Sequence, residues 1–229
     1  MRGIVFATAA VSALIIAACG QPSGASDASP KTATTPSEVR NEAVADEPAA
    51  VDFAAARSGK YTTDPKHHHL LFKYNHQGYS TSIVRWRDWT GELDWNAENP
   101  EASSIIVAIN ADKVDSGVDE FDGHLKGERF FDTPANPTVM FKSTSLSRTG
   151  PNTGKMAGDL TIKGVTKPLT LDVAINKAAF EERAGVYKLG FSGKGVVKRS
   201  EFGMDYAIPF VGDEVTIVVE AEFLSPKAE

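Results

Sequence analysis

The sequence predicts an all-β domain over residues 60–229, built as a closed antiparallel barrel of about eight strands with one short helix. Apolar and polar residues alternate with a period of two through most of residues 60–224. Turn-forming clusters such as residues 96–100 separate the alternating runs. Closure of the sheet removes edge strands that would otherwise pair with other chains. A β-sandwich has the same periodicity and remains the alternative architecture.

Residues 1–18 have the pattern of an export signal. Arg2 supplies a positive charge, and residues 4–16 form a nearly unbroken apolar run that is too short to span a bilayer. The run ends in small residues followed by Cys19, the only cysteine, and this resembles the lipobox of bacterial lipoproteins. The resemblance implies cleavage before Cys19 and its lipidation, which would anchor the chain to a membrane. The position directly after Cys19 holds Gly20 and not Asp, which resembles lipoproteins sorted to the outer membrane. We therefore expect a periplasmic protein anchored to a cell membrane, with the outer membrane favoured.

We interpret residues 19–59 as a disordered, lipidated tether. The segment is rich in Ala, Ser, Thr, Pro and Glu, and Phe53 is its single aromatic residue. Such a composition buries too little apolar surface to offset the entropy lost on ordering. The whole chain carries a formal net charge of −6 and has no basic cluster, which argues against nucleic acid as a partner.

From residue 60 the chain follows the pattern of successive strands. In one of them, Ile105, Val107 and Ile109 share a face. Gly91 is the expected bend or bulge within another, and Gly164 lies at the bend of a hairpin over residues 163–167. The expected strands cover residues 70–76, 80–88, 89–95, 103–110, 138–145, 155–163, 168–175, 186–197 and 215–223.

One segment, residues 115–132, interrupts this rhythm and predicts a short helix over one end of the barrel or on its outer wall. Phe121 and Leu125 fall on one side of it. Asp122, His124, Arg129 and Asp132 around it allow two interpretations, namely contact with a ligand headgroup or helix capping and surface ion pairing.

The strand phases predict an apolar interior, which suits either a packed core or a tunnel that holds a ligand. Gly158, Gly193 and Gly195 fall on inward phases, where missing side chains leave space or relieve strain at strand bends. The candidate ligand-binding residues are the inward-facing ones: Leu70, Phe72, Tyr74, Trp86, Trp89, Leu93, Val107, Val139, Phe141, Leu160, Leu171, Phe191 and Val219.

Five segments in order resemble the YceI-like family of lipocalin-like polyisoprenoid-binding proteins. The first contains the motif Asp64-Pro65-x-His67, and the matching segments are residues 61–78, 89–94, 124–132, 158–168 and 199–204. The resemblance implies an extended, lipocalin-like eight-stranded barrel that holds an isoprenoid chain, quinone-like or polyprenyl, for sequestration or transport. It implies no enzymatic activity and no cofactor besides that lipid. His68 and His69 stand where the family usually has small polar residues.

Two other functions stay open. His67, His68 and His69 with a nearby carboxylate suggest a metal-dependent enzyme, although their spacing is not a recognised ligand signature and we assign no metal. A structural or stress-related barrel acting through its surface is the second, with Ile106 and Ala108 on the outward phase as a possible homodimer face. No nucleophile elbow is present.

Overall fold

The structure, a computed structural model, describes residues 50–227. The expected signal segment, the lipidated Cys19 and most of the expected tether lie outside the described residues. The described residues form one compact unit that contains all of their strands. No helix among residues 50–227 is long and apolar enough to cross a bilayer.

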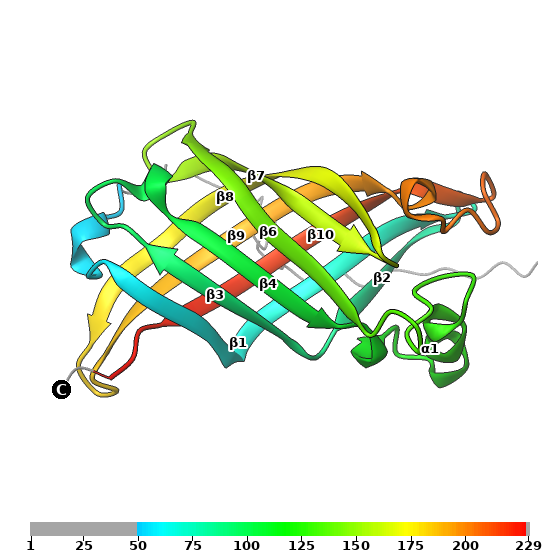
Figure 1. Cartoon of the computed structure of the whole chain (residues 1–229), viewed down its shortest axis with the longest axis horizontal. Coiled ribbons are helices and arrows are strands. Elements are labelled where there is room, and N and C mark those ends of the chain that lie inside the picture. Colours follow the sequence, from blue (N-terminus) through cyan, green and yellow to red (C-terminus); the bar gives the residue numbers. More distant parts are fainter. Residues whose placement is uncertain (1–49, 228–229) are drawn as a thin grey trace, which may run out of the picture. The chain divides into compact units, whose positions relative to one another are not determined.

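The unit is a closed, antiparallel, eight-stranded barrel, as the sequence predicts (Figure 1). Neighbouring strands follow the order β10-β9-β8-β7-β6-β4-β3-β1-β2-β5, and β10 pairs with β1 to close the sheet. The strands are β1 (Gly59–His76), β2 (Ser80–Trp86), β3 (Trp89–Trp95), β4 (Ser104–Asn110), β5 (Val114–Asp115), β6 (Thr138–Arg148), β7 (Thr153–Ile162), β8 (Val165–Glu181), β9 (Val186–Lys198) and β10 (Val211–Leu224).

The ten strand segments reduce to eight positions around the barrel because β2 and β3 share one position. β2 pairs with residues 70–76 of β1, and β3 pairs with residues 59–62 of the same strand. Between them, the chain leaves the sheet at residues 87–88, where the Arg87 amide donates to the carbonyl of Lys113. β5 is a two-residue addition to the edge of β2. The predicted strand over residues 80–88 therefore ends at Trp86.

Gly164 has the role expected from the sequence, whereas the prediction of a bend or bulge at Gly91 is wrong. Gly164 and Lys163 both have positive φ, at 73° and 50°, which gives the two-residue turn that suits a hairpin between β7 and β8. Gly91 lies within β3, and a Cβ there would come 3.0 Å from Cε1 of Phe223. Gly91 therefore allows close packing of an aromatic ring and makes no bend in the strand.

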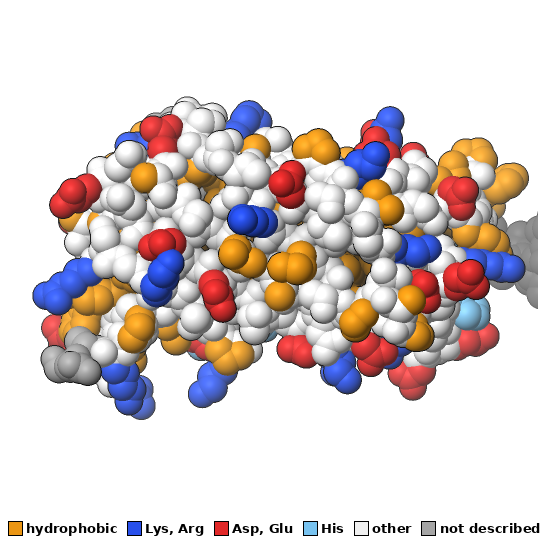
Figure 2. Space-filling view, viewed as in Figure 1, with side chains coloured by type: hydrophobic (Ala, Val, Ile, Leu, Met, Phe, Trp, Pro, Cys, Tyr) orange, Lys and Arg blue, Asp and Glu red, His pale blue; other side chains and the backbone are white. Residues whose placement is uncertain are grey.

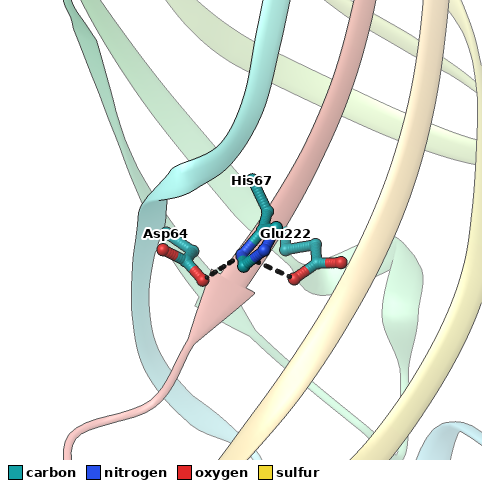
Figure 3. Close-up of side chains that lie close together, drawn as sticks. All are labelled: Asp64, His67 and Glu222. Carbon is teal, nitrogen blue, oxygen red and sulfur yellow. Dashed lines mark hydrogen bonds and ion pairs between the residues drawn. The ribbon is translucent and has the colours of Figure 1, made fainter.

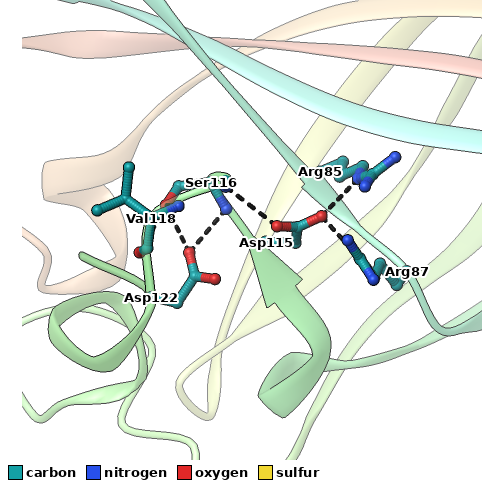
Figure 4. Close-up of polar contacts among 7 residues, drawn as sticks. Arg85, Arg87, Asp115, Ser116, Val118 and Asp122 are labelled. Carbon is teal, nitrogen blue, oxygen red and sulfur yellow. Dashed lines mark hydrogen bonds and ion pairs between the residues drawn. The ribbon is translucent and has the colours of Figure 1, made fainter. Parts of the chain in front are cut away.

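The helix α1 (Asp119–Lys126) lies at one end of the barrel. Polar contacts fix the chain that leads into it (Figure 4). Asp115 accepts hydrogen bonds from Arg85 (2.6 Å) and Arg87 (2.7 Å), which lower its pKa to about 2. Asp122 accepts from the amide (2.7 Å) and hydroxyl (2.5 Å) of Ser116. Asp122 therefore stabilises the turn before the helix.

Residues 50–58 belong to the folded unit, although we expected them in the tether. The short 3-10 helix η1 (Phe53–Ala55) packs Phe53 against Trp95, with ring centroids 6.0 Å apart. The amide of Val51 donates to Oδ1 of Asn152 (2.8 Å), and the Trp95 indole donates to the carbonyl of Ala56 (3.2 Å). The single aromatic residue of an otherwise polar segment thus extends the domain toward the N-terminus.

Candidate functional site

The interior of the barrel contains two apolar cavities. Cavity 1 has a volume of about 140 Å³ and lies among inward-facing residues of β3, β4, β6, β8, β9 and β10. Its wall is mainly aromatic and aliphatic, and Trp89, Trp95, Phe141 and Phe191 are among its largest side chains. Phe53 also lines it and lies under the guanidinium of Arg148, 5.1 Å from the ring centroid. The segment before β1 therefore covers the outer end of cavity 1.

Cavity 2 is larger, at about 360 Å³, and lies toward the end of the barrel that carries α1. Its apolar wall includes Phe72, Trp86 and Phe131, whose rings contact one another at centroid distances of 4.8–5.8 Å. Polar residues, among them His76 and His124, also line it. Its volume is within the range typical of small-molecule sites, roughly 300–1,000 Å³, whereas cavity 1 is smaller.

A belt of buried aliphatic residues separates the two cavities. Along β10, Ile217 lines cavity 2 and Val219 lines cavity 1. The belt therefore crosses the interior of the barrel between the levels of these two residues. We define the belt as five aliphatic side chains, each at most 5% exposed, that line neither cavity and lie between residues that line them: Leu70, Ile109, Val139, Leu160 and Leu169. The described barrel thus holds two apolar chambers with the belt residues between them.

The inward-phase glycines contribute to this division. At Gly195 a Cβ would lie 2.7 Å from Cδ2 of Leu171, and at Gly158 it would lie 2.4 Å from Cζ of Phe141. Neighbouring side chains therefore occupy the space that these two glycines leave. Gly193 differs, because the nearest atom to its Cβ position is 3.7 Å away and the residue lines cavity 1.

The structure places all thirteen candidate ligand-binding residues in the interior, where each is buried or packs against the core. Cavity 1 is lined by Trp89, Leu93, Val107, Phe141, Leu171, Phe191 and Val219. Cavity 2 is lined by Phe72, Tyr74 and Trp86. The remaining three, Leu70, Val139 and Leu160, belong to the belt. Contact of these residues with a ligand stays a prediction.

Arg199 is a residue of cavity 2 that sequence reasoning missed as part of the site. It is 6% exposed, and its guanidinium donates to four backbone carbonyls: those of Met204 (2.6 Å), Tyr206 (2.9 Å), Val211 (2.9 Å) and Gly212 (2.8 Å). These bonds hold the loop over residues 203–210, which borders the opening of cavity 2. Burial lowers the pKa of Arg199, an effect that nearby Asp213 opposes.

His68 is the one histidine of the 67–69 run that turns inward. Its ring stacks on Trp89 with a centroid distance of 4.5 Å, and burial, together with neighbouring His69, lowers its pKa. Nδ1 of His68 and the indole nitrogens of Trp86 and Trp89 are buried without a hydrogen-bond partner among the described residues. Each such group costs about 1–3 kcal/mol. The middle of the barrel therefore carries unsatisfied polar atoms beside its apolar chambers.

The three adjacent histidines do not converge on one point, which removes the geometric basis for a metal site built from His67, His68 and His69. His67 instead lies on the outer wall between two carboxylates (Figure 3). Its Nδ1 is 2.8 Å from Oδ2 of Asp64 and 3.6 Å from Oε2 of Glu222, and one ligand atom from each residue lies within 4.8 Å of the others. Such spacing suits a tetrahedral ion. Lys188, however, donates to the same oxygen of Glu222 at 2.8 Å.

In this outer cluster, Asp64, His67, Lys188 and Glu222 form a network of ion pairs. Burial raises the pKa of Asp64, but hydrogen bonds from His67 and from the amide of Lys66, together with nearby positive charge, outweigh burial and lower it overall. The hydrogen bond to Glu222 raises the pKa of Lys188. The network spans the irregularity between Thr63 and His68 in the β1–β10 pairing, and we interpret it as a clamp on that bulge.

Two other charged residues near the helix, Arg129 and Asp132, make local contacts. Arg129 lies over the ring of Tyr206, 4.7 Å from its centroid, and Asp132 contacts the side chain of Asn136 at 3.3 Å.

On the outer wall, Ile106 is 41% exposed and pairs with Lys142 in the sheet, so a charge flanks it. A homodimer through that face stays a prediction.

Comparison with known proteins agrees with this architecture. The model of the YceI-like domain matches residues 61–223. A UPF0312 protein of Pseudomonas aeruginosa is 31% identical over 169 residues, which cover 74% of this chain and 87% of that protein. The crystal structure of the Campylobacter jejuni YCEI protein superposes with a TM-score of 0.62 at 27% identity, covering 67% of this chain and 90% of that one.

A more distant structure shares the fold alone. It is described as a polyisoprenoid binding domain from Saccharophagus degradans, and it superposes with a TM-score of 0.56 at 10% identity, covering 74% of this chain and all of that domain. The segment that the YceI-like model matches, residues 61–223, includes all ten strands in full or in large part and most residues that line the two cavities. On this evidence, the chain belongs to the YceI-like family.

Proposed function

We propose that this barrel binds a long apolar lipid of the isoprenoid type, quinone-like or polyprenyl, and sequesters or transports it. The observation that carries the proposal is the pair of apolar chambers aligned along one barrel, each lined by large aromatic side chains. The distant relative from Saccharophagus degradans is described as polyisoprenoid-binding, which supports the same ligand class. A chain that filled both chambers would have to displace the belt leucines.

The energetics favour a carrier over a permanent store. Burial of a methylene group is worth about 0.8 kcal/mol, so a ligand of ~20 carbons gains ~16 kcal/mol relative to water. The ligand's real alternative is the membrane, which is equally apolar. Transfer between bilayer and barrel is therefore close to balance, and loading and unloading need no catalytic group.

We further propose that the chain acts in the periplasm as a lipoprotein anchored through Cys19, on the outer membrane in preference to the inner one. Anchoring would raise the local concentration of the barrel beside the membrane that supplies its ligand. The lipobox-like residues that end at Cys19 support this placement. Mass spectrometry of the membrane-extracted protein tests it: an acylated Cys19 at the N-terminus is expected, and an unmodified chain that retains residues 1–18 contradicts it.

Native mass spectrometry followed by organic extraction tests the ligand. The purified barrel should carry an isoprenoid, and Phe191→Asp should abolish its retention because a carboxylate enters the wall of cavity 1. Val219→Phe is a milder variant that fills the same cavity without charge. Phe180→Asp is the matched control, because Phe180 is 43% exposed and lines neither cavity. Unchanged lipid content in folded Val219→Phe protein would contradict the proposed site.

A further inference from the structure

One end of the barrel exposes an unusual concentration of large apolar side chains. Tyr79 is 87% exposed and Phe210 is 74% exposed, the two highest values for large hydrophobic residues in the described chain. Tyr79 lies in the turn between β1 and β2, and Phe210 lies in the loop before β10. The two turns are adjacent, since the amide of Gln77 donates to the carbonyl of Phe210 (3.1 Å). Hydrophobic side chains gather at this end in the space-filling view, at the right of Figure 2.

Residues next to these turns line cavity 2. His76 and Tyr206 line the cavity and are also exposed, so they mark its opening to solvent. Tyr206 is 50% exposed and packs against Phe130, which also lines the cavity, with ring centroids 6.1 Å apart. Ala207, another lining residue, has a φ of 64°, which is a strained backbone conformation for a residue with a side chain. The opening thus has a fixed, partly aromatic rim.

The opposite end of the barrel lacks such a rim. Phe53 covers cavity 1 there and is held by Trp95 and Arg148. Phe180, the most exposed aromatic residue of the β8–β9 end, packs against Tyr187 with a centroid distance of 4.9 Å. The two ends therefore differ: Phe53 lies over cavity 1 at one end, whereas Tyr79 and Phe210 are exposed at the other end and make no ring contact among the described residues. We call the latter the open end.

We propose that the open end docks on a lipid bilayer, with Tyr79 and Phe210 inserted at the boundary between headgroups and acyl chains, and that ligand enters and leaves cavity 2 there. This inference rests on the proposed function, because a lipid ligand has to come from a membrane. Two aromatic side chains on the tips of adjacent turns suit insertion into a soft interface, where aromatic residues are favoured. The first turn of α1 near this end carries Asp119, Glu120 and Asp122, so we assign docking to apolar contact and not to anionic lipid.

Flotation with phosphatidylcholine vesicles tests the docking directly. The chain from residue 20 to 229 contains the whole compact unit and lacks Cys19, so lipidation cannot contribute. Burial of a phenylalanine side chain increases affinity by about one to two powers of ten, so Phe210→Ser should weaken vesicle binding about tenfold or more. Adding Tyr79→Ser to that variant should weaken vesicle binding further. Phe180→Ser, an exposed phenylalanine at the other end, should bind as the unmodified chain does.

Uptake is followed with vesicles that contain ubiquinone, which quenches the tryptophans beside the two cavities. Phe210→Ser should slow the quenching and leave its final extent unchanged, because the cavity is intact. Equal slowing by Phe180→Ser, or stronger binding when anionic phosphatidylglycerol is added, would overturn the docking proposal. Phe210-dependent flotation of a chain that never takes up quinone would support docking and contradict a quinone as ligand.

Discussion

Replacement of Leu160 by alanine tests whether the belt is a barrier. Leu160 is 4% exposed and lines neither cavity. The change removes three carbon atoms, worth ~2.4 kcal/mol of transfer free energy. The new void adds about 24 cal/mol for each Å³ that stays empty, so the free energy of unfolding should fall by roughly 3–5 kcal/mol. For a domain of this size that corresponds to a decrease in Tm of roughly 6–20 °C.

Thermal unfolding followed by circular dichroism measures that loss, and native mass spectrometry with polyprenols of graded length measures the functional effect. Leu160→Ala should join the two chambers and shift retention toward longer chains. Leu189→Ala is the matched control, since Leu189 is fully buried, lines neither cavity and lies away from the belt. If both variants retain chains of the same length, the belt does not limit the ligand and the reasoning is wrong.

Three other changes test separate parts of the structure. Gly158→Ala should destabilise the barrel by about 1–3 kcal/mol, because its Cβ would lie 2.5 Å from the carbonyl oxygen of Lys142, whereas Gly193→Ala should be tolerated; equal urea midpoints would contradict this. Phe53→Ser should uncover cavity 1 and increase acrylamide quenching of tryptophan fluorescence, and unchanged quenching would show that Phe53 is not a cover. Asp115→Asn should lower the urea midpoint at pH 7, and the difference should shrink as pH falls from about 4 toward 2, because a carboxyl with a lowered pKa stabilises the fold only while ionised; a pH-independent difference would refute the assignment.

The sequence predicts the barrel well because period-two alternation determines which side chains face inward. The phases of β4 and β9, for example, correctly place Val107 and Phe191 in the interior. The hairpin at Gly164 follows from local turn chemistry, which acts over a few residues. Features of this kind depend on neighbours in the sequence and need no knowledge of the tertiary structure.

The division of the interior was beyond sequence reasoning, since it depends on the heights at which side chains from different strands meet. Leu70 and Leu160 have the same inward phase as residues that line a cavity, and only the register of the closed sheet places them in the belt. The same holds for the outer clamp, because Asp64 and Glu222 come from opposite ends of the domain. A clue was available for Phe53, the lone aromatic residue in a polar segment.

Arg199 holds the backbone of the loop over residues 203–210 without hydrogen bonding to the loop's side chains. Its guanidinium contacts only backbone carbonyls there, a group that every amino acid supplies. Substitutions at residues 205–210 should therefore change which lipids approach the opening of cavity 2, while the backbone around the opening keeps its conformation. Protein engineers who want a barrel of altered lipid preference have in this loop a segment to diversify, provided that the arginine beneath it stays in place.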